Sequence, residues 1–428
     1  MKHLYAAAVL IVLSGVSFCD EPEPVAAPIT VSPADWPWWR GPDRNGIASA
    51  EQNPVLTWSD SEHVLWRTEI PGRGHGSATV VGDQVFLATA DADRRQQQVI
   101  CLDRHTGKQQ WATTVHEGGF PDPNEKRSSG NEKASLASST VACDGTLLFI
   151  NFLNDKAVYT TALDRTGQQV WQTKICDYVI HQGYGSSPAL YEHLVIVSAD
   201  NKGGGAIAGM NRATGKIEWK RDRPMLPNYA SPIILNVVGK DQLLFTGCDL
   251  VTSLNPLTGE TYWETEGATT ECVTSTVTDG THIFTSGGYP KNHVSAVSAD
   301  GSKQLAWEST VRTYVPSMLA KDGYLYAVQD AGVATCWKSA TGEEVWKGRL
   351  AGTFSSSPVM VGDRIYATNE DGTTFVFKAS PDGYEKLADN QLGESVFATP
   401  TICGSRIYAR VAHTVDGRRQ EYLYCLGE

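Results

Sequence analysis

The chain has 428 residues, of which 41% are hydrophobic and 20% charged, and its formal net charge is −12. Proteins that bind nucleic acid need clustered positive charge to hold phosphates, so this acidic chain, which has no dense Lys/Arg stretch, is not expected to bind nucleic acid. The length exceeds that of most single hydrophobic cores and is typical of an array of repeats.

Residues 1–19 predict a secretory signal peptide. They combine a basic start, a short apolar core from Leu4 to Val16 and small residues before Asp20. The apolar run is too short for a transmembrane helix, and no second membrane segment follows it. We therefore expect export to the periplasm or the cell exterior. Lipid anchoring at Cys19 is the less favoured alternative, because bulky Phe18 precedes it where a small residue is expected.

Two irregular segments precede the repeats. Residues 20–34 are rich in Pro and Ala and predict a linker, whereas residues 35–55 form an aromatic lead-in segment. The lead-in segment contains Trp36, Trp38 and Trp39. We interpret it as a plug that packs on the body of the protein, and ligand binding by its tryptophans is the alternative. Residues 56–428 are predicted to form one domain.

A turn motif recurs through that domain. Its first copy, LDRHTGKQQW, has an apolar strand end, a polar turn with Gly107, and then Trp111 on the return strand. The glycines of the successive copies are Gly107, Gly167, Gly215, Gly259, Gly301, Gly342 and Gly383. As differences of adjacent positions, their spacings are 60, 48, 44, 42, 41 and 41. A period in the low forties, with four predicted strands per unit and no helix signal, is typical of propeller blades.

The sequence thus predicts an all-β fold, an eight-bladed β-propeller of four-stranded antiparallel blades. Seven units are complete, but the last, which begins at Thr401, has three strands and no Trp strand. We expect the missing strand at the other end of the chain, in VLWRTEI with Trp66. This N-terminal strand would complete the last blade, because a closed ring leaves no sheet edge exposed.

From Asp35 onward the chain resembles the quinoprotein-like, or PQQ-repeat, propellers. The resemblance is carried by the turn motifs, by the blade openings SSPALYEHLVIVSAD and SSSPVMVGDRIYAT, and by the lead-in DWPWWRGPDRNG. Within these propellers the chain is most similar to a group of exported proteins, typical of planctomycetes, that begin with a WPxWRG-type stretch. The family includes quinone-dependent alcohol and sugar dehydrogenases and a non-enzymatic lipoprotein that helps to assemble outer-membrane β-barrels.

The dehydrogenase branch implies a quinone held between a Trp floor and a vicinal disulfide, a calcium ion and an aspartate base. The eight cysteines after Cys19 include no adjacent pair, and no aspartate matches the base by motif. No catalytic residue is therefore carried over. We expect no cofactor and no metal site, with PQQ and calcium as the alternative.

The residues just before each first strand are predicted to ring the mouth of the central channel. They mix aromatic and titratable side chains, as small-molecule sites do. The candidate ligand-binding residues are His75, Glu132, Lys133, His181, Tyr184, Tyr229, Glu271, Tyr314, Phe354 and Phe397. The alternative is that they fill or solvate the channel mouth. The long connection at 116–134 is equally consistent with recognition and with a variable surface insert.

Function is predicted from this rim. The leading hypothesis is an exported binding or scaffolding module that recognises a protein, a glycan or a small ligand and is not an enzyme. The first alternative is a PQQ-dependent alcohol or sugar dehydrogenase with degenerate motifs. The second is a hydrolase that uses Glu132 and Glu271, which requires their carboxyl groups to lie roughly 5–10 Å apart.

Overall fold

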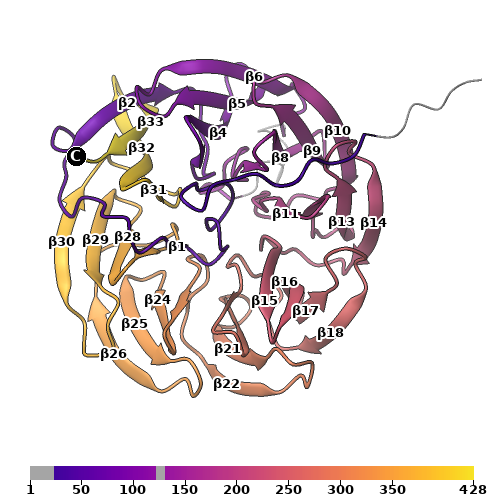
Figure 1. The fold of residues 1–428 in the computed structure, drawn as a ribbon, viewed down its shortest axis with the longest axis vertical. Helices are drawn as coiled ribbons and strands as arrows, with labels where there is room; N and C mark the ends of the chain where they lie inside the picture. Colours follow the sequence, from indigo (N-terminus) through magenta and orange to yellow (C-terminus); the bar gives the residue numbers. More distant parts are fainter. Residues whose placement is uncertain (1–23, 122–130) are drawn as a thin grey trace, which may run out of the picture.

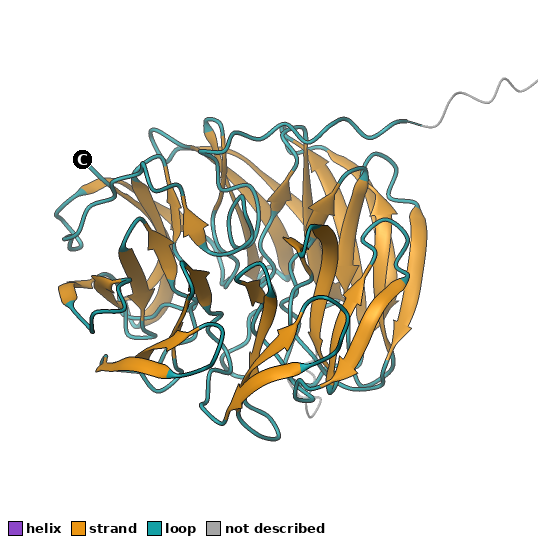
Figure 2. Cartoon of the chain, turned by 60° about the horizontal axis from the view of Figure 1, so that its bottom comes forward, coloured by secondary structure: helices purple, strands orange, loops and turns teal. Residues whose placement is uncertain are grey.

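The computed structural model describes residues 24–121 and 131–428, so the predicted signal peptide and Cys19 lie outside the described residues. Within those two ranges all helix and strand assignments are strands, and the strands form eight antiparallel sheets around a central channel (Figures 1 and 2). Each sheet is one blade, numbered here in chain order. The predicted fold class is confirmed.

The first four blades follow one another in sequence. Blade 1 consists of β3 (Thr79–Val81), β4 (Gln84–Asp91), β5 (Gln96–Asp103) and β6 (Gln109–Glu117). Blade 2 consists of β7 (Ala142–Cys143), β8 (Leu147–Asn154), β9 (Ala157–Asp164) and β10 (Gln169–Asp177). Blade 3 consists of β11 (Ala189–Tyr191), β12 (Leu194–Ser198), β13 (Gly205–Asn211) and β14 (Ile217–Arg223). Blade 4 consists of β15 (Ile233–Val237), β16 (Lys240–Gly247), β17 (Leu250–Leu254) and β18 (Thr261–Glu266).

The next three blades repeat the same strand order. Blade 5 consists of β19 (Val277–Thr278), β20 (His282–Gly287), β21 (His293–Ser298) and β22 (Leu305–Ser309). Blade 6 consists of β23 (Leu319–Lys321), β24 (Tyr324–Val328), β25 (Val333–Lys338) and β26 (Glu344–Arg349). Blade 7 consists of β27 (Val359–Val361), β28 (Arg364–Thr368), β29 (Thr373–Lys378) and β30 (Lys386–Gln391). A short parallel strand from the lead-in segment, β1 (Ile47–Ala48), pairs with β27.

Blade 8 joins the two ends of the chain. Its strands are β31 (Thr401–Cys403), β32 (Arg406–Val415), β33 (Arg418–Leu426) and, as the outermost strand, β2 (Val64–Ile70). Strand β2 runs antiparallel to β33 and places Trp66 opposite Cys425 (Figure 1). The predicted closure of the ring by the N-terminal strand is therefore confirmed.

The turn motif joins neighbouring blades. The indole N–H of Trp66 in blade 8 donates to the carbonyl of Arg104 in the turn of blade 1, at 3.0 Å. Gly107 of that turn has φ +70°, and a Cβ there would lie 2.5 Å from the Trp66 ring. The same close approach joins Trp111 with Gly167, Trp171 with Gly215, Trp219 with Gly259, and Trp307 with Gly342. Glycine is needed in these turns both for the positive φ and for the space that the indole takes.

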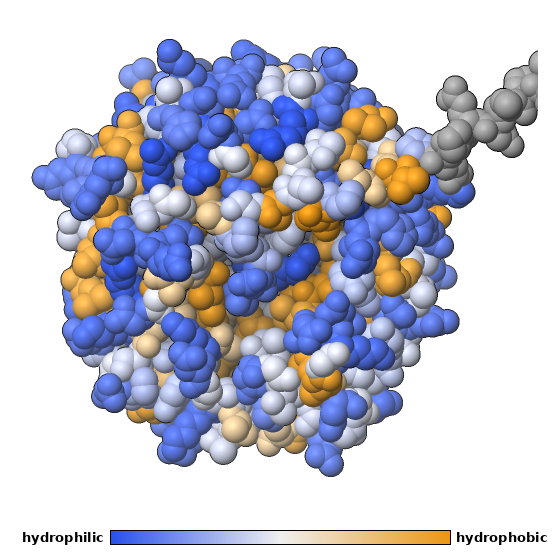
Figure 3. All heavy atoms as spheres, in the orientation of Figure 1, coloured by the Kyte–Doolittle hydropathy of each residue, from blue (hydrophilic) through white to orange (hydrophobic). Residues whose placement is uncertain are grey.

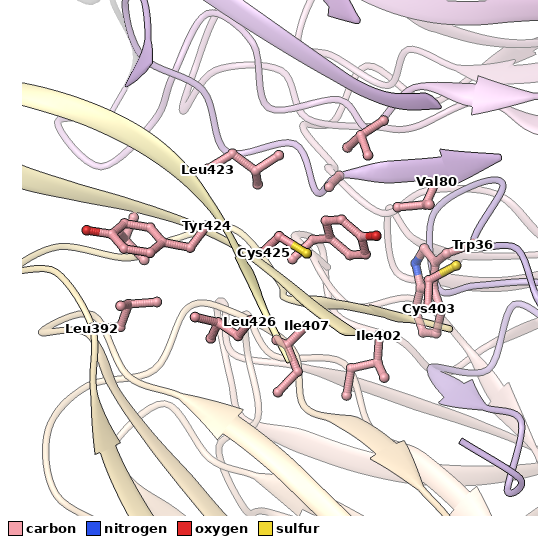
Figure 4. Packing of buried hydrophobic residues seen from close by; sticks show 14 of the residues in the cluster. Trp36, Val80, Leu392, Ile402, Cys403, Ile407, Leu423, Tyr424, Cys425 and Leu426 are labelled. Carbon is pink, nitrogen blue, oxygen red and sulfur yellow. The ribbon is translucent and has the colours of Figure 1, made fainter. Parts of the chain in front are cut away.

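Apolar side chains fill the space between the blades. One buried cluster lies where blade 8 meets blade 1, with Leu423, Cys425 and Ile407 from blade 8 and Val80 from blade 1 (Figure 4). Trp36 of the lead-in segment belongs to the same cluster and is 2% exposed. The lead-in segment thus packs on the propeller as the plug that its composition predicts, and it crosses the centre of the ring in Figure 1.

The surface of the plugged face is mostly polar. Figure 3 shows hydrophilic side chains over most of it, with hydrophobic ones in separate small patches. No helix in the part of the chain that the structure describes is long and apolar enough to cross a membrane.

Candidate functional site

The central channel contains a cavity of about 340 Å³. Its rim is formed by the connections that lead into the first strands of the blades, and we call this end the channel mouth. Trp39 of the lead-in segment also lines the cavity. Aromatic rings and hydroxyl groups dominate the walls, a combination suited to a small organic ligand.

Six of the ten predicted site residues line this cavity. They are His75, Lys133, Tyr184, Tyr229, Tyr314 and Phe397. Two more, His181 and Glu271, contact the lining tyrosines from behind. Glu132 is exposed and Phe354 is buried, and neither one lines the cavity.

The structure brings four of the predicted residues into one hydrogen-bonded group, the Glu271 cluster. His181 Nδ1 lies 3.3 Å from Glu271 Oε1 and 3.1 Å from the Tyr229 hydroxyl. The Tyr314 hydroxyl donates to Glu271 Oε2 at 3.1 Å. These residues precede the first strands of blades 3, 4, 5 and 6, so the connections into four successive blades build the cluster.

Burial keeps the two tyrosines of this cluster protonated. The Glu271 side chain is only 4% exposed. Burial, followed by the Glu271 carboxylate, raises the pKa of Tyr229 and of Tyr314 above their usual range. Both phenols therefore stay protonated at physiological pH. The Tyr314 hydroxyl donates to Glu271, whereas the Tyr229 hydroxyl pairs with His181 Nδ1.

His75 forms the opposite wall with Phe397. The two rings stack with centroids 4.6 Å apart and planes inclined by 23°. Burial, and then the charge of Arg73, lowers the pKa of His75 well below its ordinary value. Arg73 Nε donates to His75 Nε2 at 3.3 Å, so His75 is neutral and carries its proton on Nδ1.

The remaining predicted residues have other partners. Lys133 Nζ lies 2.7 Å from Glu370 Oε2, and the Ser355 hydroxyl donates to Glu370 Oε1 at 2.6 Å. Phe354 is 1% exposed and packs against Phe375 of β29, 6.1 Å between ring centroids. The exposed Glu132 lies outside the lining and Glu271 is buried behind it, so neither of these two carboxyl groups lines the cavity.

Below the rim lies a ring of hydroxyl groups that was not predicted from the sequence, the hydroxyl belt. Six of its seven members accept a backbone N–H from the preceding blade, as when Thr140 N donates to Ser187 Oγ at 3.0 Å, and the seventh, Ser275, accepts the indole N–H of Trp39. The belt consists of Thr140, Ser187, Ser231, Ser275, Ser317, Ser357 and Thr399. Its signal in the sequence is a Ser or Thr at the start of each first strand, often followed by Pro. A hydroxyl that accepts one hydrogen bond keeps its own O–H for a ligand.

The donor set fits a bound quinone and calcium ion poorly. In the two described ranges no group of three or more His, Cys, Asp or Glu side chains is placed to hold a metal ion. Glu271 Oε2 accepts the Tyr314 hydroxyl and Oε1 lies 3.3 Å from His181 Nδ1, while Lys133 in the lining is paired with Glu370. The eight cysteines within the described part of the chain are free thiols, so no disulfide covers the cavity.

Comparison with known proteins identifies the family. Residues 34–121, 95–330 and 290–386 match the family described as outer membrane protein assembly factor BamB. The chain belongs to this family. It is 25% identical over 382 residues to the BamB of Burkholderia pseudomallei (strain K96243), covering 86% of this chain and 88% of that protein.

Dehydrogenases are also similar to this chain. It is 27% identical over 266 residues to a polyvinylalcohol dehydrogenase from a Pseudomonas species. That match covers 57% of this chain and 38% of the dehydrogenase, so the chain spans less than half of that relative.

Solved structures agree with the fold. BamB from Moraxella catarrhalis superimposes with a TM-score of 0.58 at 15% identity, over 84% of this chain and 99% of that one. A europium-containing methanol dehydrogenase superimposes with a TM-score of 0.66 at 12% identity, over 93% and 98%. The BamB family and the dehydrogenases thus share one architecture, and at these identities the likeness concerns the fold alone.

Proposed function

We propose that this protein is an exported binding module that holds its ligand in the cavity at the channel mouth. The observation that carries the proposal is the cavity itself, about 340 Å³ and lined by rings and hydroxyl groups from successive blades. Such a pocket, with an apolar surface and a few convergent polar groups, is typical of ligand sites. Its ligand is a small molecule, a glycan or a side chain presented by a partner protein.

Three features support binding over catalysis. Glu271 is buried behind the lining, where it accepts the Tyr314 hydroxyl and contacts His181. His75 is neutral, with Nε2 occupied by Arg73. The B. pseudomallei relative that aligns over 88% of its length is named as an assembly factor, not as an enzyme. Export is supported by the signal-like residues 1–19.

The test compares two tyrosine variants that each lose one hydroxyl group. Tyr229 lines the cavity, whereas the Tyr191 hydroxyl bonds to Asp241 elsewhere in the fold. Glycans, small molecules and candidate partner proteins are screened for binding to the full chain by calorimetry. We expect Tyr229→Phe to weaken binding about tenfold, as the loss of about one hydrogen bond predicts, and Tyr191→Phe to leave it unchanged. Ligands that bind both variants as tightly as the wild type would place the site elsewhere.

The alternative is a PQQ-dependent dehydrogenase, favoured by the similarity to polyvinylalcohol dehydrogenase. If it were correct, PQQ would supply the oxidising group, and the rings that line the cavity, Trp39 and Tyr314 among them, would be the surfaces available to stack on it. Purified protein is mixed with PQQ and calcium, and dye-linked oxidation of alcohols, polyvinyl alcohol included, is measured. We expect no turnover. Clear turnover would overturn the binding-module proposal.

A further inference from the structure

The three lead-in tryptophans have different environments. Trp36 is 2% exposed and Trp38 is 6% exposed, and both pack into buried hydrophobic clusters. Trp39 is partly exposed and lines the cavity. A partly exposed indole on the wall of a cavity offers a large flat apolar surface to whatever enters.

The indole of Trp39 is held in position. Its N–H donates to Ser275 Oγ at 2.8 Å, and Ser275 belongs to the hydroxyl belt. The next residue, Arg40, is 1% exposed and donates to the backbone carbonyls of Asn45, Met318 and Pro358. These bonds tie the lead-in segment to blades 6 and 7.

A second arginine holds the other side of the segment. Arg44 donates to the Leu190 carbonyl of blade 3 at 2.7 Å, and its guanidinium lies 4.5 Å from the Trp38 ring centroid. With both arginines anchored, the position of Trp39 is set before any ligand arrives. Preorganisation of this kind lowers the entropic cost of binding.

The one Lys of the lining and the carboxyl group behind it both have partners. Lys133 is held by Glu370, and Glu271 contacts His181 and accepts the Tyr314 hydroxyl. The groups left to meet a ligand are neutral: the Trp39 face, the His75 Nδ1–H, and belt hydroxyls such as Ser231 and Ser317, which neighbour Ser275. A neutral ligand with oxygens at its edge satisfies these donors without leaving a charge buried and unpaired.

We propose that Trp39 contacts the ligand directly, so that the lead-in segment, which lies outside the blades, completes the binding site. The ligand class is a neutral six-membered ring that places one apolar face on the indole and edge oxygens on the hydroxyl belt. A sugar pyranose and a neutral oxygenated aromatic ring share this chemistry. This inference rests on the proposed function and adds a ligand class and a contact residue to it.

The test uses two sets of probe ligands, one for sugar rings and one for aromatic rings. Methyl glucoside and maltose represent pyranoses, and 4-hydroxybenzyl alcohol represents aromatic rings. Binding to the full chain is measured by saturation-transfer NMR and titration. We expect one set to bind the wild type, Trp39→Ala to weaken that binding about tenfold, and Trp39→Phe to weaken it less because a ring remains. Failure of both sets on the wild type would overturn the ligand class.

Matched variants separate a contact from a structural effect. Trp263→Phe removes a buried indole that bonds to Gln242 within blade 4, away from the cavity, and should leave binding unchanged. Thermal unfolding shows whether each variant is folded. If Trp39→Ala does not fold, Trp39→Phe and Ser275→Ala decide, and unchanged affinity in both would overturn the proposal. If Tyr229→Phe weakens binding but the Trp39 variants do not, the proposed function stands and Trp39 is rejected as a ligand contact.

Discussion

Among single residues, the buried histidines are those whose charge the fold controls most directly. His293 on β21 is fully buried, and burial lowers its pKa to about 4. Its Nδ1 has no hydrogen-bond partner among the described residues, and its Nε2 lies 3.4 Å from the Thr285 hydroxyl. His116 is partly buried beside Phe152 and Tyr159, and burial lowers its pKa to about 4 as well. Both are neutral in the native protein at neutral pH.

This burial predicts a loss of stability in acid. In the unfolded chain a histidine has a pKa of about 6.5, so below that pH the unfolded state binds a proton that native His293 does not bind. The free energy of unfolding should fall as the pH drops from about 6.5 towards 4, by about 2 kcal/mol from His293 at pH 5. Urea unfolding at pH 7 and pH 5 measures this difference. His293→Phe should reduce it.

One result would contradict this prediction of acid destabilisation by His293. If His293→Phe loses as much stability between pH 7 and pH 5 as the wild type, His293 is not neutral and buried in the native state. The same comparison with His116→Phe tests the second site.

At the scale of the element, the unit of construction is a turn glycine packed under the tryptophan of the preceding blade. The Trp66–Gly107 contact repeats at four further junctions, so blade-to-blade packing is built from one local motif. Thr68 strengthens the first of them, because its hydroxyl donates to the Gly107 carbonyl at 2.6 Å. This explains why the motif recurs with the period of the blades.

Substitutions at two glycines distinguish the cost of backbone strain from the cost of a steric clash. Gly107 and Gly362 both have positive φ, but a Cβ at Gly362 would meet nothing within 4 Å, whereas at Gly107 it would lie 2.5 Å from the Trp66 ring. We expect Gly362→Ala to cost about 1 kcal/mol of unfolding free energy from backbone strain. Gly107→Ala should cost about 2–4 kcal/mol because it also displaces the indole. Equal costs in urea unfolding would contradict the packing role of the glycine.

At the scale of the whole molecule, stability depends on closing the ring between blades 8 and 1. Besides the pairing of β2 with β33, a buried ion pair holds this junction: Arg410 Nε lies 2.7 Å from Glu421 Oε2. Arg410 also donates to the Ala88 carbonyl of blade 1, and Gly74 N donates to Glu421 Oε2 at 3.1 Å. Residues from both ends of the chain thus meet in one buried network.

Two truncations test this closure. A chain that begins at Asp35 keeps the lead-in segment and β2, and should remain a folded monomer. A chain that begins at Gly72 lacks the lead-in segment as well as β2 and exposes the edge of β33, so we expect it to unfold more easily and, through that edge, to self-associate. Size-exclusion chromatography and thermal unfolding compare the two. A stable monomer from the shorter chain would show that β2 is dispensable.

The architecture could be predicted from the sequence because local sequence motifs that repeat along the chain determine it. The spacing of the turn glycines predicts the blades, and the incomplete last unit together with Trp66 predicts how the ring closes. The rim positions of His181, Tyr229, Glu271 and Tyr314 follow from the same period, since each precedes a first strand.

The contacts of those rim side chains could be seen only in the tertiary structure. Residues 181, 229, 271 and 314 are far apart in the sequence and meet because the ring curves, while Phe354, at an equivalent position, packs against Phe375 and misses the cavity. Arg40 and Arg44 contact distant blades, and these contacts position the lead-in segment. They place Trp39 at the cavity and the other two tryptophans in the core. The sequence by itself determined the blades and the closure, because strand period and turn chemistry act over a few residues. The tertiary structure decided the site, because the direction of a side chain in a non-repeating connection depends on partners that only the closed ring brings near.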